Sequence, residues 1–142
     1  MQLSTMGRYA VMAMTDLASR PVDRATPLAA IAETQQISKA YLEQLFSRLR
    51  RRGLVRSVRG PGGGYRLARA AEALSVAEVV AAVDEPLKAT RCAGHGPGCM
   101  KGGARCLTHE LWAETGRQLE TYLAGVSLAD VVNGDLQRER AA

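Results

Sequence analysis

A run of five residues, Gly60-Pro61-Gly62-Gly63-Gly64, restricts the fold of this chain more than any other feature of its sequence. Glycine loses more conformational freedom than other residues when it is ordered, and proline lacks a backbone N–H group, so the run cannot form a helix or sustain a strand. Apolar and polar residues alternate on both sides of it, over 54–59 and 65–67. The pattern predicts a β-hairpin with a long glycine-rich tip.

Two helices are expected immediately before this hairpin. The pair at 26–27, Thr-Pro, predicts an N-cap followed by a proline in the first helical position, with a short helix over 28–34. Ser38 predicts a second N-cap, and the next helix is expected over 39–52, ending at Gly53. Its apolar residues recur at helical spacing: Leu42, Leu45, Phe46 and Leu49. A helix-turn-helix followed by a hairpin is the arrangement of a winged helix, with 39–52 as the recognition helix.

The remaining helices are expected to pack around this unit and to extend from it. Ser4 predicts the N-cap of a first helix that ends near residue 20, and Ser75 and Ser127 each open a short helix with an acid three residues later. A long helix is expected over 107–124, and its apolar residues step by four and three: Trp112, Gly116, Leu119, Leu123 and Val126. Such a seam suits packing against another helix, which we interpret as a homodimer contact, with burial inside one domain as the alternative.

The fold class expected is therefore mostly α-helical with a small β-hairpin wing, a winged helix-turn-helix domain joined to a long dimerisation helix. We predict a DNA-binding domain over 1–84 and a cysteine-containing loop over 85–106. The dimerisation helix and a short C-terminal helix are expected over 107–134, and a frayed tail over 135–142.

Positive charge is concentrated in the winged-helix part of the chain. The formal net charge is +5, and eight arginines but no acidic residue occur within 48–69. This basic stripe indicates an anionic partner, most simply double-stranded DNA, although a solvated surface is the alternative. No apolar run approaches the length of a membrane span, and the first residues lack the features of a signal peptide, so a cytoplasmic protein without membrane contact is expected.

Three cysteines follow the winged helix at even intervals, Cys92, Cys99 and Cys106, with six residues between neighbours. His109 lies three residues after Cys106, on the same face of the expected long helix. Three thiols and one imidazole supply four ligands, and wide glycine-rich spacing favours an iron–sulfur cluster over zinc, which usually binds a close cysteine pair. A zinc site and redox-active thiols remain alternatives, and His95 is a rival fourth ligand. We find no Cys-x-x-Cys, P-loop or nucleophile elbow, so neither an enzyme nor a small-molecule substrate is expected.

Several stretches carry a resemblance that extends to about residue 133. They are Gly7-Arg8-Tyr9-Ala10-Val11, Tyr41-Leu42-Glu43-Gln44-Leu45-Phe46, Val58-Arg59-Gly60-Pro61-Gly62-Gly63-Gly64-Tyr65, Ala89-Thr90-Arg91-Cys92 and Cys106-Leu107-Thr108-His109-Glu110-Leu111-Trp112. On these the chain resembles a bacterial family of dimeric winged-helix repressors, and within it the regulators that bind an iron–sulfur cluster. The resemblance implies a [2Fe-2S] cluster held by Cys92, Cys99, Cys106 and His109. It also implies a homodimer paired near Trp112, Leu119 and Leu123, and repression of genes for cluster assembly.

The residues predicted to contact DNA lie on the recognition helix, on the wing and on the first helix. They are Ser38, Lys39, Tyr41, Glu43, Gln44, Ser47, Arg51, Arg59, Gly60 and Tyr9. Gln44 can pair with adenine, and Glu43 can accept a hydrogen bond from cytosine while repelling phosphate. Arg59 is expected in a narrow minor groove, and Arg51 at a phosphate. A repressor of the same family that senses nitric oxide or redox state with a different cluster is the nearer alternative, and a winged-helix protein with structural zinc is another.

Overall fold

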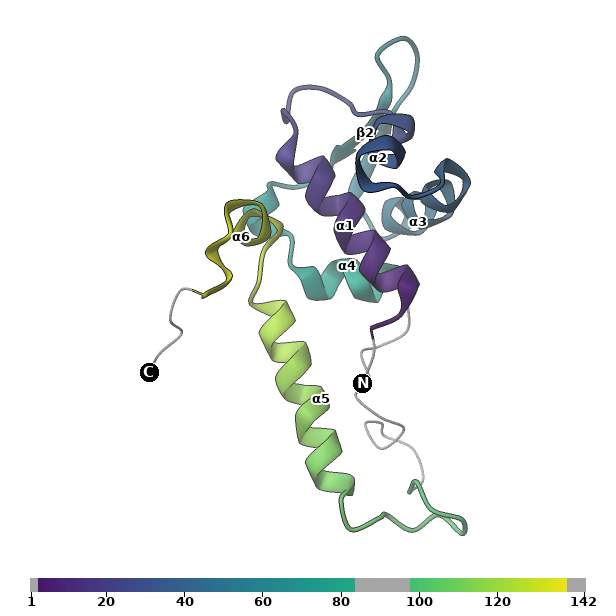
Figure 1. Cartoon of the computed structure of the whole chain (residues 1–142), viewed down its shortest axis with the longest axis vertical. Helices are drawn as coiled ribbons and strands as arrows, with labels where there is room; N and C mark the ends of the chain where they lie inside the picture. The colour runs from purple at the N-terminus through teal and green to yellow at the C-terminus, as the bar shows by residue number, and fades with distance from the viewer. Residues whose placement is uncertain (1–2, 84–97, 138–142) are drawn as a thin grey trace.

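The computed structural model of the chain describes residues 3–83 and 98–137. Its elements are α1 (Thr5–Ser19), α2 (Leu28–Gln35), α3 (Lys39–Arg51), β1 (Val55–Val58), β2 (Gly64–Leu67), the 3-10 turn η1 (Ala71–Ala73), α4 (Val76–Val83), α5 (His109–Ala124), α6 (Leu128–Asn133) and the 3-10 turn η2 (Asp135–Gln137). The two strands pair antiparallel, with Val55 opposite Leu67 and Val58 opposite Gly64. The predicted fold class, mostly helical with a hairpin wing, is confirmed (Figure 1).

The core lies where α1 packs against α2, α3 and α4. All four apolar residues predicted for the inner face of α3 are buried, and Phe46 among them is fully enclosed. The Phe46 ring lies 4.9 Å from the ring of Tyr65 on β2, measured between ring centroids. This contact joins the recognition helix to the base of the wing, so the two parts of the winged helix share one core.

A buried carboxylate fixes α1 against the end of α2. Asp16 accepts hydrogen bonds from Arg20 Nε (2.6 Å), from the Thr34 hydroxyl and from Gln35 Nε2 (2.8 Å). Burial alone raises the pKa of Asp16, but these hydrogen bonds and the Arg20 charge outweigh it and hold the pKa below its usual range. Gln36, the next residue, takes the left-handed conformation (φ 55°) that turns the chain into α3. The network therefore sets the geometry of the helix-turn-helix.

The wing is attached to the segment between α1 and α2. The backbone N–H of Thr26 donates to the Tyr65 carbonyl (2.9 Å), and the Tyr65 N–H donates back to the Thr26 carbonyl (2.8 Å). Arg66 adds two hydrogen bonds from its guanidinium to the Val22 carbonyl, at 3.1 and 2.6 Å. The prediction that Thr26 is the N-cap of α2 is wrong by one residue, because this pairing holds Thr26 in a β-bridge and Pro27 takes the N-cap position.

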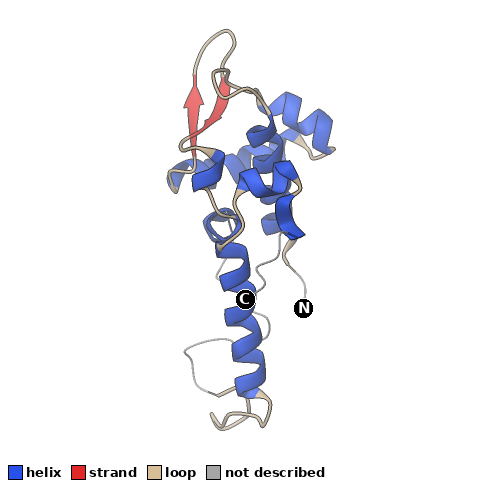
Figure 2. Ribbon diagram, turned by 90° about the vertical axis from the view of Figure 1, so that its left-hand side faces the viewer, coloured by secondary structure: helices blue, strands red, loops and turns tan. Residues whose placement is uncertain are grey.

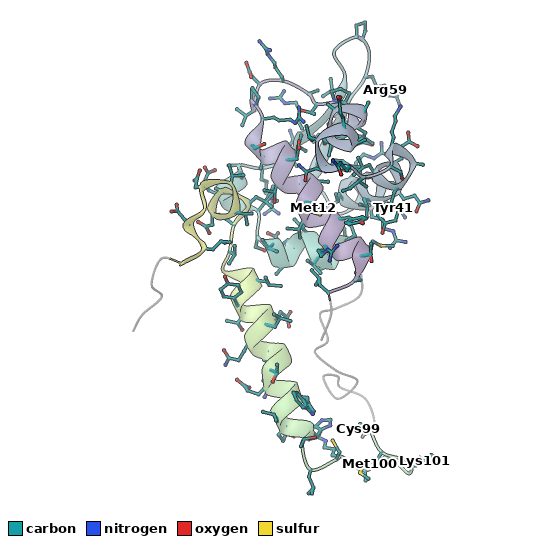
Figure 3. The ribbon with its side chains drawn as sticks, in the orientation of Figure 1. Met12, Tyr41, Arg59, Cys99, Met100 and Lys101 are labelled. Atoms are coloured by element: carbon teal, nitrogen blue, oxygen red, sulfur yellow. The ribbon has the colours of Figure 1, made fainter. Side chains whose placement is uncertain are left out.

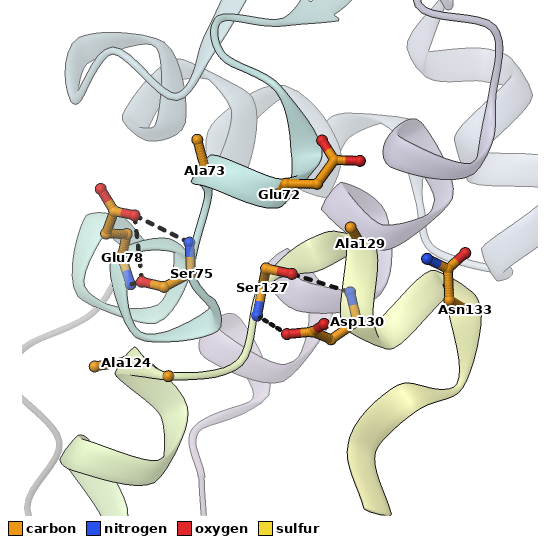
Figure 4. A pocket seen from close by; sticks show the side chains of 10 residues that line it. Glu72, Ala73, Ser75, Glu78, Ala124, Ser127, Ala129, Asp130 and Asn133 are labelled. Carbon is orange, nitrogen blue, oxygen red and sulfur yellow. Dashed lines mark hydrogen bonds between the residues drawn. The ribbon is translucent and has the colours of Figure 1, made fainter. Parts of the chain in front are cut away.

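The last helices join the winged helix through two capping boxes that face each other (Figure 4). Ser75 and Glu78 exchange hydrogen bonds at the start of α4, as Ser127 and Asp130 do at the start of α6. Ser75 and Ser127 also form an antiparallel bridge, which brings the two helix starts together. Both predicted caps are confirmed, and the first residues of the predicted tail form η2 instead of fraying.

Helix α5 projects away from the rest of the chain (Figures 1 and 2). At its C-terminal end, Leu123 packs against a small cluster of Val76, Val80 and Val126. The helix begins at His109, two residues later than predicted, because residues 106–109 form a tight turn in which the His109 N–H bonds to the Cys106 carbonyl at 3.0 Å. Among the described helices, none has the length and apolar character needed to span a membrane.

Candidate nucleic-acid interface and metal-ligand site

The outer face of α3 is polar and open. Lys39, Glu43 and Gln44 are exposed on it, while Ser47 is half-buried. The Ser38 hydroxyl caps the helix by accepting a hydrogen bond from the Tyr41 N–H at 3.1 Å. Because the N-terminal half of such a helix is the part that enters a major groove, Glu43 and Gln44 have side chains of the right kind and position to meet base edges.

Tyr9 and Tyr41 join α1 to the start of α3. Their rings meet edge to face, with centroids 5.8 Å apart and planes at 85°. Both tyrosines are half-buried, so each ring packs against the core while one side stays open to solvent. The exposed Arg8 guanidinium lies 5.8 Å from the Tyr9 ring centroid. Arg8 is not among the residues predicted from the sequence to contact DNA, although it directly precedes the predicted contact Tyr9.

The tip of the wing carries Arg59 and Gly60, both exposed (Figure 3). Gly60 has a φ of +91°, which favours glycine, and its carbonyl accepts a hydrogen bond from the Gly63 N–H at 2.9 Å. The tip is thus a tight, side-chain-poor turn with one cation beside it. This shape suits close approach to a phosphate backbone or entry into a minor groove.

The basic stripe is divided between two roles. Three of its arginines bond to groups of the protein: Arg48 to the Val83 carbonyl, Arg66 to the Val22 carbonyl and Arg69 to the Glu78 carboxylate. Arg51 folds back along α3, with its guanidinium 3.4 Å from the Ser47 hydroxyl. The exposed cations Arg50, Arg52, Arg56 and Arg59 remain on the surface formed by the end of α3 and the wing. The stripe is therefore partly structural and partly a cationic surface.

The second candidate site lies at the far end of α5 (Figure 3). Cys99 Sγ is 3.9 Å from His109 Nδ1, and it also accepts a hydrogen bond from the Cys106 N–H at 3.4 Å. Cys99 and Cys106 are half-buried, whereas His109 is only 6% exposed. The predicted ligand Cys92 lies outside the described residues, as does His95, the rival of His109 for the fourth ligand position, and as do 85–97 of the predicted loop. Over 3–83 and 98–137, no three His, Cys, Asp or Glu side chains meet in a metal-binding group.

The loop that carries Cys99 is folded by backbone hydrogen bonds between residues close in sequence. The Gly98 N–H donates to the Gly103 carbonyl (3.1 Å), and the Met100 N–H donates to the Ala104 carbonyl (3.0 Å). A Cβ on Gly98 would lie 2.2 Å from the Ala104 oxygen, so only glycine fits there. This turn brings Cys99 back onto His109, ten positions later in the sequence.

The donor set fits a transition metal or a small iron–sulfur cluster. Thiolate and imidazole ligands select zinc, copper and iron–sulfur centres over the hard cations that prefer oxygen. The N–H of Cys106 aimed at the Cys99 sulfur is the kind of contact that stabilises a thiolate ligand and tunes a cluster. Two of the four predicted ligands, Cys99 and His109, face each other directly, and Cys106 adjoins them through its backbone.

Comparison with known proteins defines the class. Residues 3–134 match the Rrf2 family, described as an iron-dependent transcriptional regulator. The chain belongs to this family of transcriptional regulators, and the resemblance seen in the sequence is confirmed.

The particular relatives are regulators named IscR and CymR. The chain is 54% identical over 133 residues to the HTH-type transcriptional regulator IscR of Yersinia pestis, covering 94% of this chain and 80% of that protein. Among solved structures, T. potens IscR has a TM-score of 0.77 and 33% identity, covering 99% of this chain and 94% of that one. CymR of B. subtilis, described as the global cysteine regulator, has a TM-score of 0.79 and 30% identity, covering 94% and 98%. The chain is an IscR-type DNA-binding transcriptional regulator and not an enzyme.

Proposed function

We propose that this regulator senses iron–sulfur cluster supply through a [2Fe-2S] cluster and represses genes for cluster assembly. The observation that carries the proposal is the approach of Cys99 and His109 to 3.9 Å at the end of a helix attached to a winged helix-turn-helix domain. A sensor site and a DNA-binding surface are thus two separate parts of one chain, as a regulator requires.

The cluster ligands in this proposal are Cys92, Cys99, Cys106 and His109. The fraction of protein that carries the cluster would follow the supply of iron and sulfide. His109 would bind metal as a neutral imidazole, without the charge that strengthens a thiolate bond, so its bond to metal is easier to lose than that of a thiolate. Its burial shields it from solvent, and the Cys99 sulfur lies beside its Nδ1. The ligand set therefore suits a site that is filled and emptied in use.

On the DNA side, α3 is proposed to enter the major groove and the wing to lie over the adjacent minor groove. Gln44 has a donor and an acceptor for adenine, and Glu43 accepts from cytosine N4 and disfavours bases that lack a donor. Arg59 is proposed to enter the minor groove, and Arg51 and Lys39 to contact phosphates. The other DNA contacts proposed are Ser38, Tyr41, Ser47, Gly60 and Tyr9.

The chain is proposed to act as a homodimer through α5. The helix has 16 residues, which corresponds to about 24 Å. Leu111, Trp112 and Tyr122 expose 56, 38 and 47% of their surface on it, and large apolar side chains grouped on a surface are typical of an interaction site. A second copy of α5 would cover them and place two recognition helices on one palindromic site. Leu119, which is half-buried, and Leu123, which already packs inside the chain, flank this contact.

The test of the cluster proposal compares two histidine variants after anaerobic reconstitution with iron and sulfide. Iron, acid-labile sulfide and the visible absorption spectrum are measured for wild type, His109→Ala and His95→Ala. We expect about two irons and two sulfides per chain in the wild type, a changed spectrum in His109→Ala and a wild-type spectrum in His95→Ala. Stoichiometric zinc without sulfide in the wild type would refute the cluster, and a change confined to His95→Ala would refute the ligand assignment.

A further inference from the structure

Within the described residues, Arg48 is the one arginine of the recognition helix that bonds to the end of another helix. Its Nη1 donates to the carbonyl of Val83 at 2.8 Å, across 35 positions of sequence. Val83 is the last residue of α4 and is 1% exposed. The last carbonyls of a helix have no partner within it and carry partial negative charge, so a guanidinium there is favourable in both hydrogen bonding and charge.

Helix α4 lies between the DNA-binding surface and the proposed ligand site. One side of it packs against α1 and α3, and Val76 and Val80 on it share a cluster with Val126 beyond the end of α5. The other end of α5 begins at His109. Val83 is also nine positions before Cys92 along the chain. The proposed ligands are therefore linked to α4 in two ways, through the chain that follows Val83 and through the packing of Leu123 and Val126 against α4.

We infer that Arg48 is a positioning residue that couples the state of the cysteine site to the orientation of the recognition helix. It does so by fixing α3 to the C-terminal end of α4, so that a displacement of α4 is passed to α3. This inference rests on the proposed function, because it requires a cysteine site that changes state. Arg48 is exposed like Arg50 on the same helix, and it differs from Arg50 in its bond to the Val83 carbonyl.

The alternative role for Arg48 is a phosphate contact, and the two make opposite predictions. A cation that meets DNA contributes to the salt dependence of binding, since each neutralised phosphate adds about 0.9 to the slope of log affinity against log salt. A cation that fixes one helix to another leaves that slope unchanged and alters the response to the sensor. Coupling between two sites typically changes affinity about 5- to 150-fold, which is measurable.

The experiment compares Arg48→Gln with Arg50→Gln, which removes the same charge from an exposed neighbour on α3. Dissociation constants for an operator obtained by selection from a randomised duplex library are measured by fluorescence anisotropy. Each protein is measured with and without reconstituted cluster over a series of salt concentrations. Hydrogen exchange of the backbone amides over 79–83 is followed in the same samples, and Arg48→Lys is included as the conservative variant.

We expect Arg48→Gln to reduce the ratio of the two dissociation constants by about fivefold or more, with an unchanged salt slope and faster exchange over 79–83. Arg50→Gln should keep the ratio and lower the slope by about 0.9. Arg48→Lys, which keeps a charged donor, should restore most of the ratio. An unaltered ratio in Arg48→Gln, or a slope reduced as in Arg50→Gln, would overturn the inference alone. A wild type whose two forms bind equally would overturn the proposed function and the coupling with it.

Discussion

Replacing Gly64 with alanine tests how the wing is attached to the rest of the domain. A Cβ at this position would lie 2.2 Å from the Thr26 oxygen and 2.6 Å from the Pro27 nitrogen, so strand β2 must move away from the backbone at 26–27. That movement breaks the two hydrogen bonds between Thr26 and Tyr65, at 2.9 and 2.8 Å. At about 0.5–1.5 kcal/mol each, their loss costs about 1–3 kcal/mol of unfolding free energy.

Gly62→Ala is the matched control for this change. Gly62 also has a positive φ, +73°, but nothing lies within 4 Å of a Cβ built on it. Both variants therefore place alanine at a positive φ, which costs about 1–3 kcal/mol, and only Gly64→Ala adds the broken pairing. The difference corresponds to a Tm about 2–12 °C lower than that of the control, at about 2–4 °C per kcal/mol.

Thermal unfolding followed by circular dichroism measures this difference, and anisotropy with operator DNA measures its effect on binding. We expect Gly64→Ala to bind DNA more weakly than Gly62→Ala, because the hairpin that carries Arg59 loses its anchor. A Gly64→Ala protein that melts within about 1 °C of the control and binds DNA equally well would refute this account of the wing.

Three further predictions concern the buried carboxylate, base selection and the dimer. Asp16→Asn should cost about 2 kcal/mol at pH 7 in urea unfolding, since it removes hydrogen bonds to a charged group. Because the folded pKa of Asp16 is lowered, its contribution is complete above the unfolded pKa of about 3.9 and is lost as the pH falls through the folded value, so the two proteins should converge in strong acid. Glu43→Ala should relax base selection in a randomised duplex library by about 1–3 kcal/mol at one position of the operator, and an unchanged consensus would contradict its assigned role. Trp112→Ser should shift sedimentation towards the monomer while leaving the helical circular dichroism of the chain unchanged, and a dimer of wild-type strength would exclude this face.

Much of the fold follows from local sequence patterns. The apolar spacing on α3, the serine caps and the glycine run each specify their element through interactions between residues close in the chain. Local patterns gave a wrong prediction where a residue far along the chain determines the backbone conformation. Thr26 resembles an N-cap, but Tyr65, far along the chain, holds it in a β-bridge. No local signal marks that pairing.

The candidate sites show the same division. The spacing of Cys106 and His109 predicts that they share one face of the long helix, but the helix begins at His109 and Cys106 lies in the turn before it. The contact that the structure adds, between Cys99 and His109, depends on the turn at Gly98 and is not visible in the spacing. Charge alone assigns every arginine of the basic stripe to DNA, whereas Arg48, Arg66 and Arg69 bond to groups of the protein, and the partners of Arg48 and Arg66 lie 35 and 44 positions away.

The central claim is that the cysteine site holds an iron–sulfur cluster. The most direct measurement is the visible absorption and electron paramagnetic resonance spectrum of the protein purified without oxygen, with iron and sulfide assays on the same sample. The account predicts a coloured protein with about two irons and two sulfides per chain and, after one-electron reduction, the paramagnetic signal of a [2Fe-2S] centre. A protein that remains colourless after anaerobic reconstitution and carries one zinc per chain would contradict it.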